Sequence, residues 1–164
     1  MEYIRLRTCK SVTTTEYFAN YCQLTRWVNW LFPDIGGIWR GGHKTPEILF
    51  SRVLEFFHRA DELSDRHNKP VLLKMVSFPS GGHQVYTPKV QMDFYERVLT
   101  YCRSDIDRPR RVSLSFYSAF NPVWKKSSLG FDESEEHLGI CDQYCEPKPA
   151  ASMFRQIPKI YLQE

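Results

Sequence analysis

The sequence predicts an α/β fold in which short parallel strands alternate with covering helices. Two long segments have apolar residues at helical spacing, and each begins with Thr-Pro. Short and almost continuously apolar runs precede, separate and follow these segments. Such runs are typical of parallel strands covered by helices, whereas half-exposed antiparallel strands alternate apolar and polar residues. We therefore expect alternating strands and helices with right-handed crossovers, in a single domain that spans residues 1–164.

The apolar runs give the predicted strands, which are SVTTTE (11–16), WLFPDIGGIW (30–39), PVLLKMV (70–76) and RVSLSFYSAF (111–120). Residues 16–31 are predicted to form a short helix between the first two strands. A long irregular stretch, 121–149, follows the last strand, and residues 139–142 are expected to add a short extended piece.

Two helices are predicted, each with a threonine N-cap and proline at the first helical position. Behind Thr45-Pro46 the apolar face is Ile48, Leu49, Val53, Phe56, Phe57, Ala60 and Leu63. Behind Thr87-Pro88 it is Val90, Phe94, Val98, Tyr101 and Cys102. We expect the polar residues of both helices, His58 and His67 included, to face solvent.

Charge and composition favour neither nucleic acid nor a membrane as a partner. The formal net charge is only +3, and the one dense basic cluster, RPRR at 108–111, stands in a connector that contains proline. No apolar run is long enough to span a bilayer, and the N-terminus lacks a signal-peptide core. Taken as written, the sequence predicts a cytoplasmic protein.

Five cysteines do not follow the spacing of a small disulfide-rich scaffold. His137, Cys141 and Cys145 are spaced by four residues, as metal ligands on one helix face would be. Gly139 and Pro147 argue against a helix there, so no metal site and no cofactor is predicted.

Four stretches in order resemble the C-terminal half of glycoside hydrolase family 17, in its bacterial β-1,3-glucanase-like branch. They are VTTTE with FPDIGGIW, then PVLLKMVSFPSGG, then SFYSAFNPVWKK, then EEHLGICDQYCEPKPA. The branch typically has PVLLKETGFPSGG, FAYFEAFDQPWK and EAHWGLFDSDRTPKPA at the last three. The resemblance covers most of residues 11–151.

The resemblance implies part of a (β/α) TIM-type barrel and the hydrolysis or transfer of β-1,3-glucan by two glutamates. Retention of configuration needs one carboxylate as nucleophile and a second as acid/base. A barrel of this type usually takes about 250 residues. We therefore expect the chain to hold roughly the C-terminal half, with the acid/base strand upstream of Met1.

Departures from the family pattern fall on positions that the resemblance places at the active site. Met75 stands where the nucleophilic glutamate would be, and a thioether cannot form a glycosyl ester. Ser77 replaces a glycine, Ser118 a second glutamate and Asn121 an aspartate. Further changes are Asp34 for asparagine, Gly36-Gly37 for His-Pro and Leu138 for tryptophan. We expect the chain to be catalytically inactive.

Glu16 and Asp34 are the remaining carboxylates at predicted strand ends. The carboxyl ends of barrel strands face the active site, so the two residues form a conceivable alternative pair. Equally, Glu16 caps the following turn and Asp34 anchors the glycine-rich loop. The acidic run Asp132, Glu133, Glu135 and Glu136 is expected on the solvated surface.

Aromatic and hydrogen-bonding side chains around the strand ends are candidates for sugar contact. These candidates are Trp39, Lys74, Ser77, Phe78, Tyr117, Ser118, Asn121 and Trp124. The alternative is that the aromatic rings among them belong to the core or cover the edges of the sheet.

Half a barrel would leave two bare sheet edges, which favours self-association or a partner that supplies the N-terminal half. Three functions remain open: an inactive relative that binds β-glucan oligosaccharides, a hydrolase active only after assembly with the missing half, and a non-catalytic half-barrel that docks onto another protein.

Overall fold

The computed structural model describes residues 15–16, 25, 28–35, 45–104 and 112–155. Side chains are described for all of these except Thr15, Glu16, Met75, Arg103 and Ser104. The chain divides into two compact units. Unit 1 is Met1–Ile38, Arg52–Val76 and Asp105–Phe116, and unit 2 is Trp39–Ser51, Ser77–Ser104 and Tyr117–Glu164.

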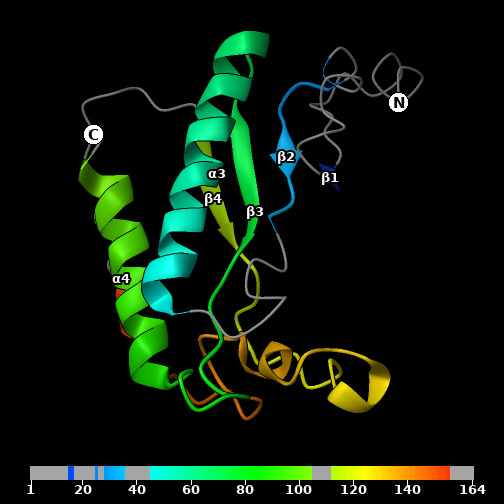
Figure 1. The fold of residues 1–164 in the computed structure, drawn as a ribbon, viewed down its shortest axis with the longest axis vertical. Helices are drawn as coiled ribbons and strands as arrows, with labels where there is room; N and C mark the ends of the chain where they lie inside the picture. The colour runs from blue at the N-terminus through cyan, green and yellow to red at the C-terminus, as the bar shows by residue number, and fades with distance from the viewer. Residues whose placement is uncertain (1–14, 17–24, 26–27, 36–44, 105–111, 156–164) are drawn as a thin grey trace. The chain divides into compact units, whose positions relative to one another are not determined.

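Unit 1 contains four short parallel strands, labelled in Figure 1. They are β1 (Thr15–Glu16), β2 (Phe32–Pro33), β3 (Val71–Val76) and β4 (Val112–Phe116). β1 pairs with β2 and β3 pairs with β4, both in parallel. Parallel bridges from Leu31 to Val71 and from Asp34 to Lys74 join the two pairs. The predicted parallel pairing is therefore confirmed, although β1 and β2 are shorter than expected.

One extra residue interrupts the ladder between β3 and β4. Leu73 lies opposite Leu114, but the next pair is Val76 with Phe116, so β3 advances by one residue more than β4. This β-bulge contains Lys74 and Met75. Bulges of this kind bend a strand, leave one residue unpaired and often lie next to active sites.

Helix α3 (Pro46–His67) confirms the first predicted helix. Its N-cap is Thr45, whose Oγ1 accepts a hydrogen bond from the Ile48 amide at 3.4 Å. The predicted apolar face is buried apart from Phe56, which is partly exposed, and Ile48, which is 48% exposed. Within unit 1 the face includes Val53, Phe57, Ala60 and Leu63.

The connection from α3 to β3 is held by polar groups. Asn68 ends the helix with a φ of 50°, a left-handed conformation that asparagine tolerates. The Lys69 ammonium then donates hydrogen bonds to the backbone carbonyls of Thr25 and Val28. One lysine thus ties a segment that precedes β2 to the start of β3.

Unit 2 is built around α4 (Pro88–Ser104), the second predicted helix. The Thr87 Oγ1 accepts from the Val90 amide at 3.2 Å, as expected for an N-cap. Phe78, Tyr86, Phe94 and Tyr95 pack in successive ring contacts, with centroid distances of 5.0–5.6 Å. Val90 is only half buried, whereas Gln91, Tyr95 and Leu99 add a buried side to the helix that its apolar pattern did not predict.

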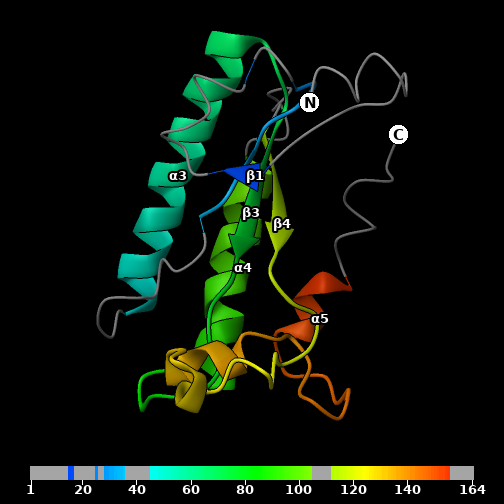
Figure 2. The same cartoon turned by 90° about the vertical axis from the view of Figure 1, so that its right-hand side faces the viewer.

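The loops after residue 117 lie at the level of the N-terminal end of α4 (Figure 2). They include the short helices η3 (Ser127–Leu129), η4 (Glu133–His137) and α5 (Ala151–Phe154). Cys141 forms bridges with Phe120 and Pro147, which agrees with the short extended piece predicted at 139–142. A Cβ on Gly139 would lie 2.2 Å from the carbonyl carbon of Phe120, so only glycine allows this close approach.

Several predictions fall outside the described residues, among them most of the helix expected at 16–31, Trp39, Gly36-Gly37 and RPRR at 108–111. Within the described part of the chain, no helix has the length and apolar character that crossing a membrane requires.

We predict that Gly139→Ala destabilises the protein by about 3 kcal/mol or more, because the new methyl group would overlap backbone atoms. Gly130→Ala is the matched control. Gly130 has a φ of 84° but nothing within 4 Å of its Cβ position, so only the backbone cost of about 1–2 kcal/mol applies. Urea unfolding of both variants measures the difference, and equal losses would contradict the prediction.

Candidate functional site

The carboxyl ends of β1, β2 and β3 form the first candidate site, in unit 1. Glu16 is the last residue of β1 and lies opposite Pro33 of β2. Asp34, which follows Pro33, forms a bridge with Lys74 of β3. The register therefore places Glu16 and Asp34 on neighbouring strands at the same edge, as the sequence predicted. We call this the strand-end site.

Asp34 and Lys74 form an ion pair at the strand-end site. Lys74 Nζ lies 3.4 Å from Asp34 Oδ2, with side chains 30% and 23% exposed, and 5.9 Å from the centre of the Phe32 ring. A retaining glycosidase needs two carboxylates about 5–5.5 Å apart. One partner of the Asp34 carboxylate is thus an ammonium group.

Met75 lies in the bulge of β3, directly after Lys74. Whatever direction its side chain takes, a thioether has no ionisable oxygen with which to attack an anomeric carbon. The residue at the resemblance's nucleophile position is thus unsuited to that role by its chemistry alone.

A cluster of aromatic rings around one ammonium group forms the second candidate site, in unit 2. Lys125 Nζ lies 4.5 Å from the centre of the Tyr117 ring and 5.5 Å from the centres of the Trp124 and Phe131 rings. All three distances are within the range of cation–π attraction. We call these four residues, with Glu135, the aromatic loop site.

Glu135 supplies the countercharge at the aromatic loop site. Lys125 Nζ and Glu135 Oε2 are 2.7 Å apart, and the two residues are only 5% and 1% exposed. Burial by itself lowers the pKa of Lys125, but polar contacts with Glu135 and Tyr117 outweigh it and raise that pKa above its usual value. Lys125 therefore stays charged.

Trp124 presents the exposed surface of this site. Its side chain is 59% exposed, and its ring stands at 90° to the Phe131 ring with centroids 5.6 Å apart. An exposed indole face is the kind of surface on which the C–H groups of a sugar ring pack. Among the predicted sugar-contact residues that the structure describes, Trp124 is the most exposed.

Asn121 is held by Lys148, a residue that the sequence analysis did not single out. Lys148 Nζ lies 2.6 Å from Asn121 Oδ1 and 2.8 Å from both Ser80 Oγ and the Gly139 carbonyl oxygen. These acceptors match the three N–H donors of an ammonium group. The Asn121 amide keeps its Nδ2 for other partners, and Gln143 Oε1 lies 3.5 Å from it.

Other predicted contact residues have structural surroundings. Ser77 and Phe78 are fully buried, and Phe78 packs against Tyr86 and Phe94, so the structure does not place either side chain where a sugar would meet it. The Ser118 hydroxyl donates to the Phe120 carbonyl oxygen. Tyr117 is partly exposed, with one ring contact taken by Lys125.

The acidic run of unit 2 is only partly solvated, which corrects the expectation from the sequence. Asp132 and Glu133 are exposed, but Glu135 is buried because it neutralises Lys125. Neither its charge nor its neighbours in the sequence distinguish Glu135 from Glu136. The signal that was available is that Lys125, Glu135 and Lys148 all match the family stretches PWK, EAHWG and TPKPA.

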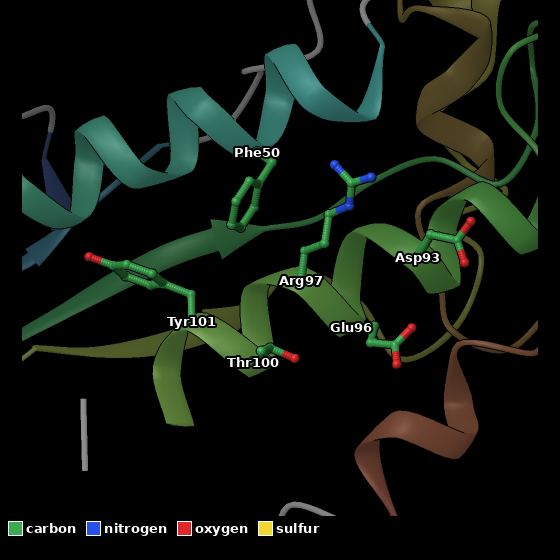
Figure 3. Close-up of a pocket in the computed structure, with 6 residues that line it drawn as sticks. All are labelled: Phe50, Asp93, Glu96, Arg97, Thr100 and Tyr101. Atoms are coloured by element: carbon green, nitrogen blue, oxygen red, sulfur yellow. The ribbon is translucent and has the colours of Figure 1, made fainter. Parts of the chain in front are cut away.

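A shallow hollow of about 600 Å³ lies between the N-terminal part of α3 and the middle and C-terminal turns of α4 in unit 2 (Figure 3). Phe50 points from α3 toward α4, and Arg97 points back toward α3. The remaining lining residues are Asp93, Glu96, Thr100 and Tyr101. Arg97 Nη2 lies 3.3 Å from Glu47 Oε1, and both side chains are largely exposed, so solvent screens this pair.

His137, Cys141 and Cys145 do not form a metal site in the structure. Across the part of the chain that is described, no group of three His, Cys, Asp or Glu side chains is arranged to hold a metal ion. Burial, with the charge of Lys148 adding to it, lowers the pKa of His137.

No family model matches the chain, and no curated protein matches its sequence. Solved structures do match its fold. A β-glucuronidase from Faecalibacterium prausnitzii is 12% identical with a TM-score of 0.56, over 90% of this chain and 24% of that one. The β-D-glucuronidase of Dictyoglomus thermophilum is 13% identical with a TM-score of 0.58, over 94% of this chain and 26% of that one.

The chain therefore has a glycoside hydrolase-like fold, and it spans about a quarter of the length of these two enzymes. At such low identity the likeness concerns the fold alone. It agrees with the class of protein that the sequence resemblance indicated, while membership of family 17 remains a prediction.

We predict that the stability contributed by Lys148 depends on pH. Burial lowers the pKa of Lys148 from 10.5 to about 8 in the folded protein. Between pH 8 and 10.5 the unfolded chain thus binds more protons than the folded one, so the free energy of unfolding rises with pH in this window. Lys148→Met should lack this rise, whereas Lys89→Met, at an exposed position of α4, should keep it.

Urea unfolding of the three proteins at pH 7, 8, 9 and 10 measures the effect. A difference between wild type and Lys148→Met that stays constant over this range would show that the lysine titrates normally.

Proposed function

We propose that this protein is a non-hydrolysing relative of β-1,3-glucanases that binds β-glucan oligosaccharides at the aromatic loop site. The observation that carries the proposal is the exposed ring of Trp124, which is backed by Phe131 and stands on a buried ion pair. The glycoside hydrolase-like fold and the resemblance to family 17 support carbohydrate as the ligand class.

Two features support the absence of hydrolysis. The nucleophile position of the resemblance is Met75, and Asp34, a carboxylate at the neighbouring strand end, is paired with Lys74. Neither provides the two separately acting carboxyl groups that glycosidic cleavage requires. The proposed activity is therefore recognition of the sugar without its cleavage.

Titration with laminari-oligosaccharides, followed by calorimetry and tryptophan fluorescence, tests this function. We expect saturable binding by the wild type and a loss of affinity of about tenfold or more in Trp124→Ala, since stacking on an indole ring contributes on the order of 1–2 kcal/mol. Tyr144→Ala removes an aromatic ring that is 76% exposed elsewhere in unit 2 and should bind as the wild type does.

The absence of saturable binding by the wild type would refute glucan recognition. Binding that Trp124→Ala and Tyr144→Ala leave equally intact would move the site away from the aromatic loop.

A second candidate is a hydrolase that becomes active after assembly with a separate polypeptide that supplies further barrel strands. The strand register favours it, because Glu16 and Asp34 end neighbouring strands. Laminarin hydrolysis by the chain mixed with an N-terminal half, abolished by Glu16→Gln or Asp34→Asn, would establish this function. We expect no release of reducing sugar, either by the chain alone or by the mixture.

The sheet itself supports a role for partners. Among the described strands, β4 pairs with β3, and a strand at the edge of a sheet can pair with a strand of another chain. We infer that a second copy of the chain or a separate N-terminal half adds strands there and extends the sheet toward a barrel. Size-exclusion chromatography with light scattering would reveal this as a dimer or a heterodimer, whereas a compact monomer at every concentration would contradict it.

A further inference from the structure

We propose that Lys125 and Glu135 are positioning residues that fix the ring of Trp124, and thereby set the affinity of the aromatic loop site for sugar. The link to sugar affinity rests on the proposed function. The positioning of the ring does not, because it follows from contacts within unit 2 alone.

The ammonium group of Lys125 is the common partner of the rings. Tyr117, Trp124 and Phe131 each place a ring centre 4.5–5.5 Å from Nζ, and the last two rings meet edge to face. A cation attracts the electron-rich face of each ring, and this attraction strengthens when water is excluded. With only 5% of Lys125 exposed, little water competes for its charge.

Glu135 makes the buried charge tolerable. Its carboxylate lies 2.7 Å from Nζ and is itself 1% exposed. Burying two charges costs desolvation that their attraction often only balances, so such a pair is a poor source of net stability. What the pair provides here is a fixed position for the ammonium group. The Glu135 carboxylate holds Nζ in place, and the three rings pack around it.

Trp124 and the ion pair have different roles because they differ in exposure. Trp124 is 59% exposed and meets solvent, whereas Lys125 and Glu135 are buried. A bound sugar would therefore contact the indole ring and not the ion pair. The ion pair therefore acts on sugar binding through the position of the Trp124 ring. An apolar side chain of the same length as Lys125 would fill the space beside this ring but would not attract it.

Chemical rescue tests this inference. Lys125→Ala removes the side chain beyond Cβ, and n-propylammonium has the three carbons and the charged nitrogen that are lost. In Lys125→Ala we expect laminari-oligosaccharide affinity to fall about tenfold and n-propylammonium to restore most of it. Propan-1-ol, which has a similar shape but no charge, should restore nothing. Lys126→Ala, at an exposed neighbouring position, should behave as the wild type.

A readout without sugar separates the inference from the proposed function. In protein labelled with 5-fluorotryptophan, the ¹⁹F resonance of Trp124, assigned by Trp124→Phe, should broaden or shift in Lys125→Ala and return with n-propylammonium. This result combined with no glucan binding by the wild type would keep the positioning role and discard the sugar function. An unchanged resonance would overturn the positioning role.

Charge and length are separated by two further variants, which also serve if Lys125→Ala fails to fold. Lys125→Arg keeps the charge and should retain the Trp124 resonance and affinity within about threefold. Lys125→Met keeps the length without the charge and should lose both the wild-type Trp124 resonance and the affinity. Glu135→Gln should lose each of them in part. Equal behaviour of the Arg and Met variants would show that packing alone holds the ring.

Discussion

The arrangement of unit 2 depends on one half-buried ammonium group. Lys148 binds Ser80, Asn121 and Gly139, which lie on three separate loops, at 2.6–2.8 Å. Three directed hydrogen bonds from one charged donor thus hold these loops together, in addition to buried apolar side chains such as Phe78 and Leu138. The segment that begins at Asn121 and carries Trp124 and Lys125 is anchored at this point.

The residues shared with the family 17 pattern serve this construction. Ser80, Lys125, Glu135, Gly139 and Lys148 all agree with the family stretches, and each has a contact that explains it: a hydrogen bond to an ammonium, a buried ion pair, or a backbone approach that admits no side chain. Met75 and Ser118, where the resemblance places glutamates, are among the positions that differ from the pattern. What this chain shares with the family pattern therefore includes residues that hold the loops of unit 2 together.

Local signals allowed most of the fold to be predicted from the sequence. Thr45 and Thr87 cap their helices as expected because a cap depends on neighbours within one turn. Long-range partners were not predictable in this way. The burial of Glu135 depends on Lys125, and that of Phe78 on Tyr86 and Phe94. A strand-end serine or phenylalanine looks the same in sequence whether it faces a ligand or the interior, so the predicted sugar contacts were only partly placed on an accessible surface.

The bulge in β3 has a consequence for how this chain could diverge. A residue in a regularly paired strand is constrained in two ways. Its backbone forms ladder hydrogen bonds, and its side chain must fit its neighbours on one face of the sheet. The additional residue between Leu73 and Val76 interrupts the pairing with β4 where Lys74 and Met75 lie, while Lys74 still pairs with Asp34 on its other side. Substitution at this point leaves the β3–β4 ladder before and after it intact. We therefore expect a change of side chain within the bulge to disturb the surrounding sheet less than the same change at Leu73 or Val76.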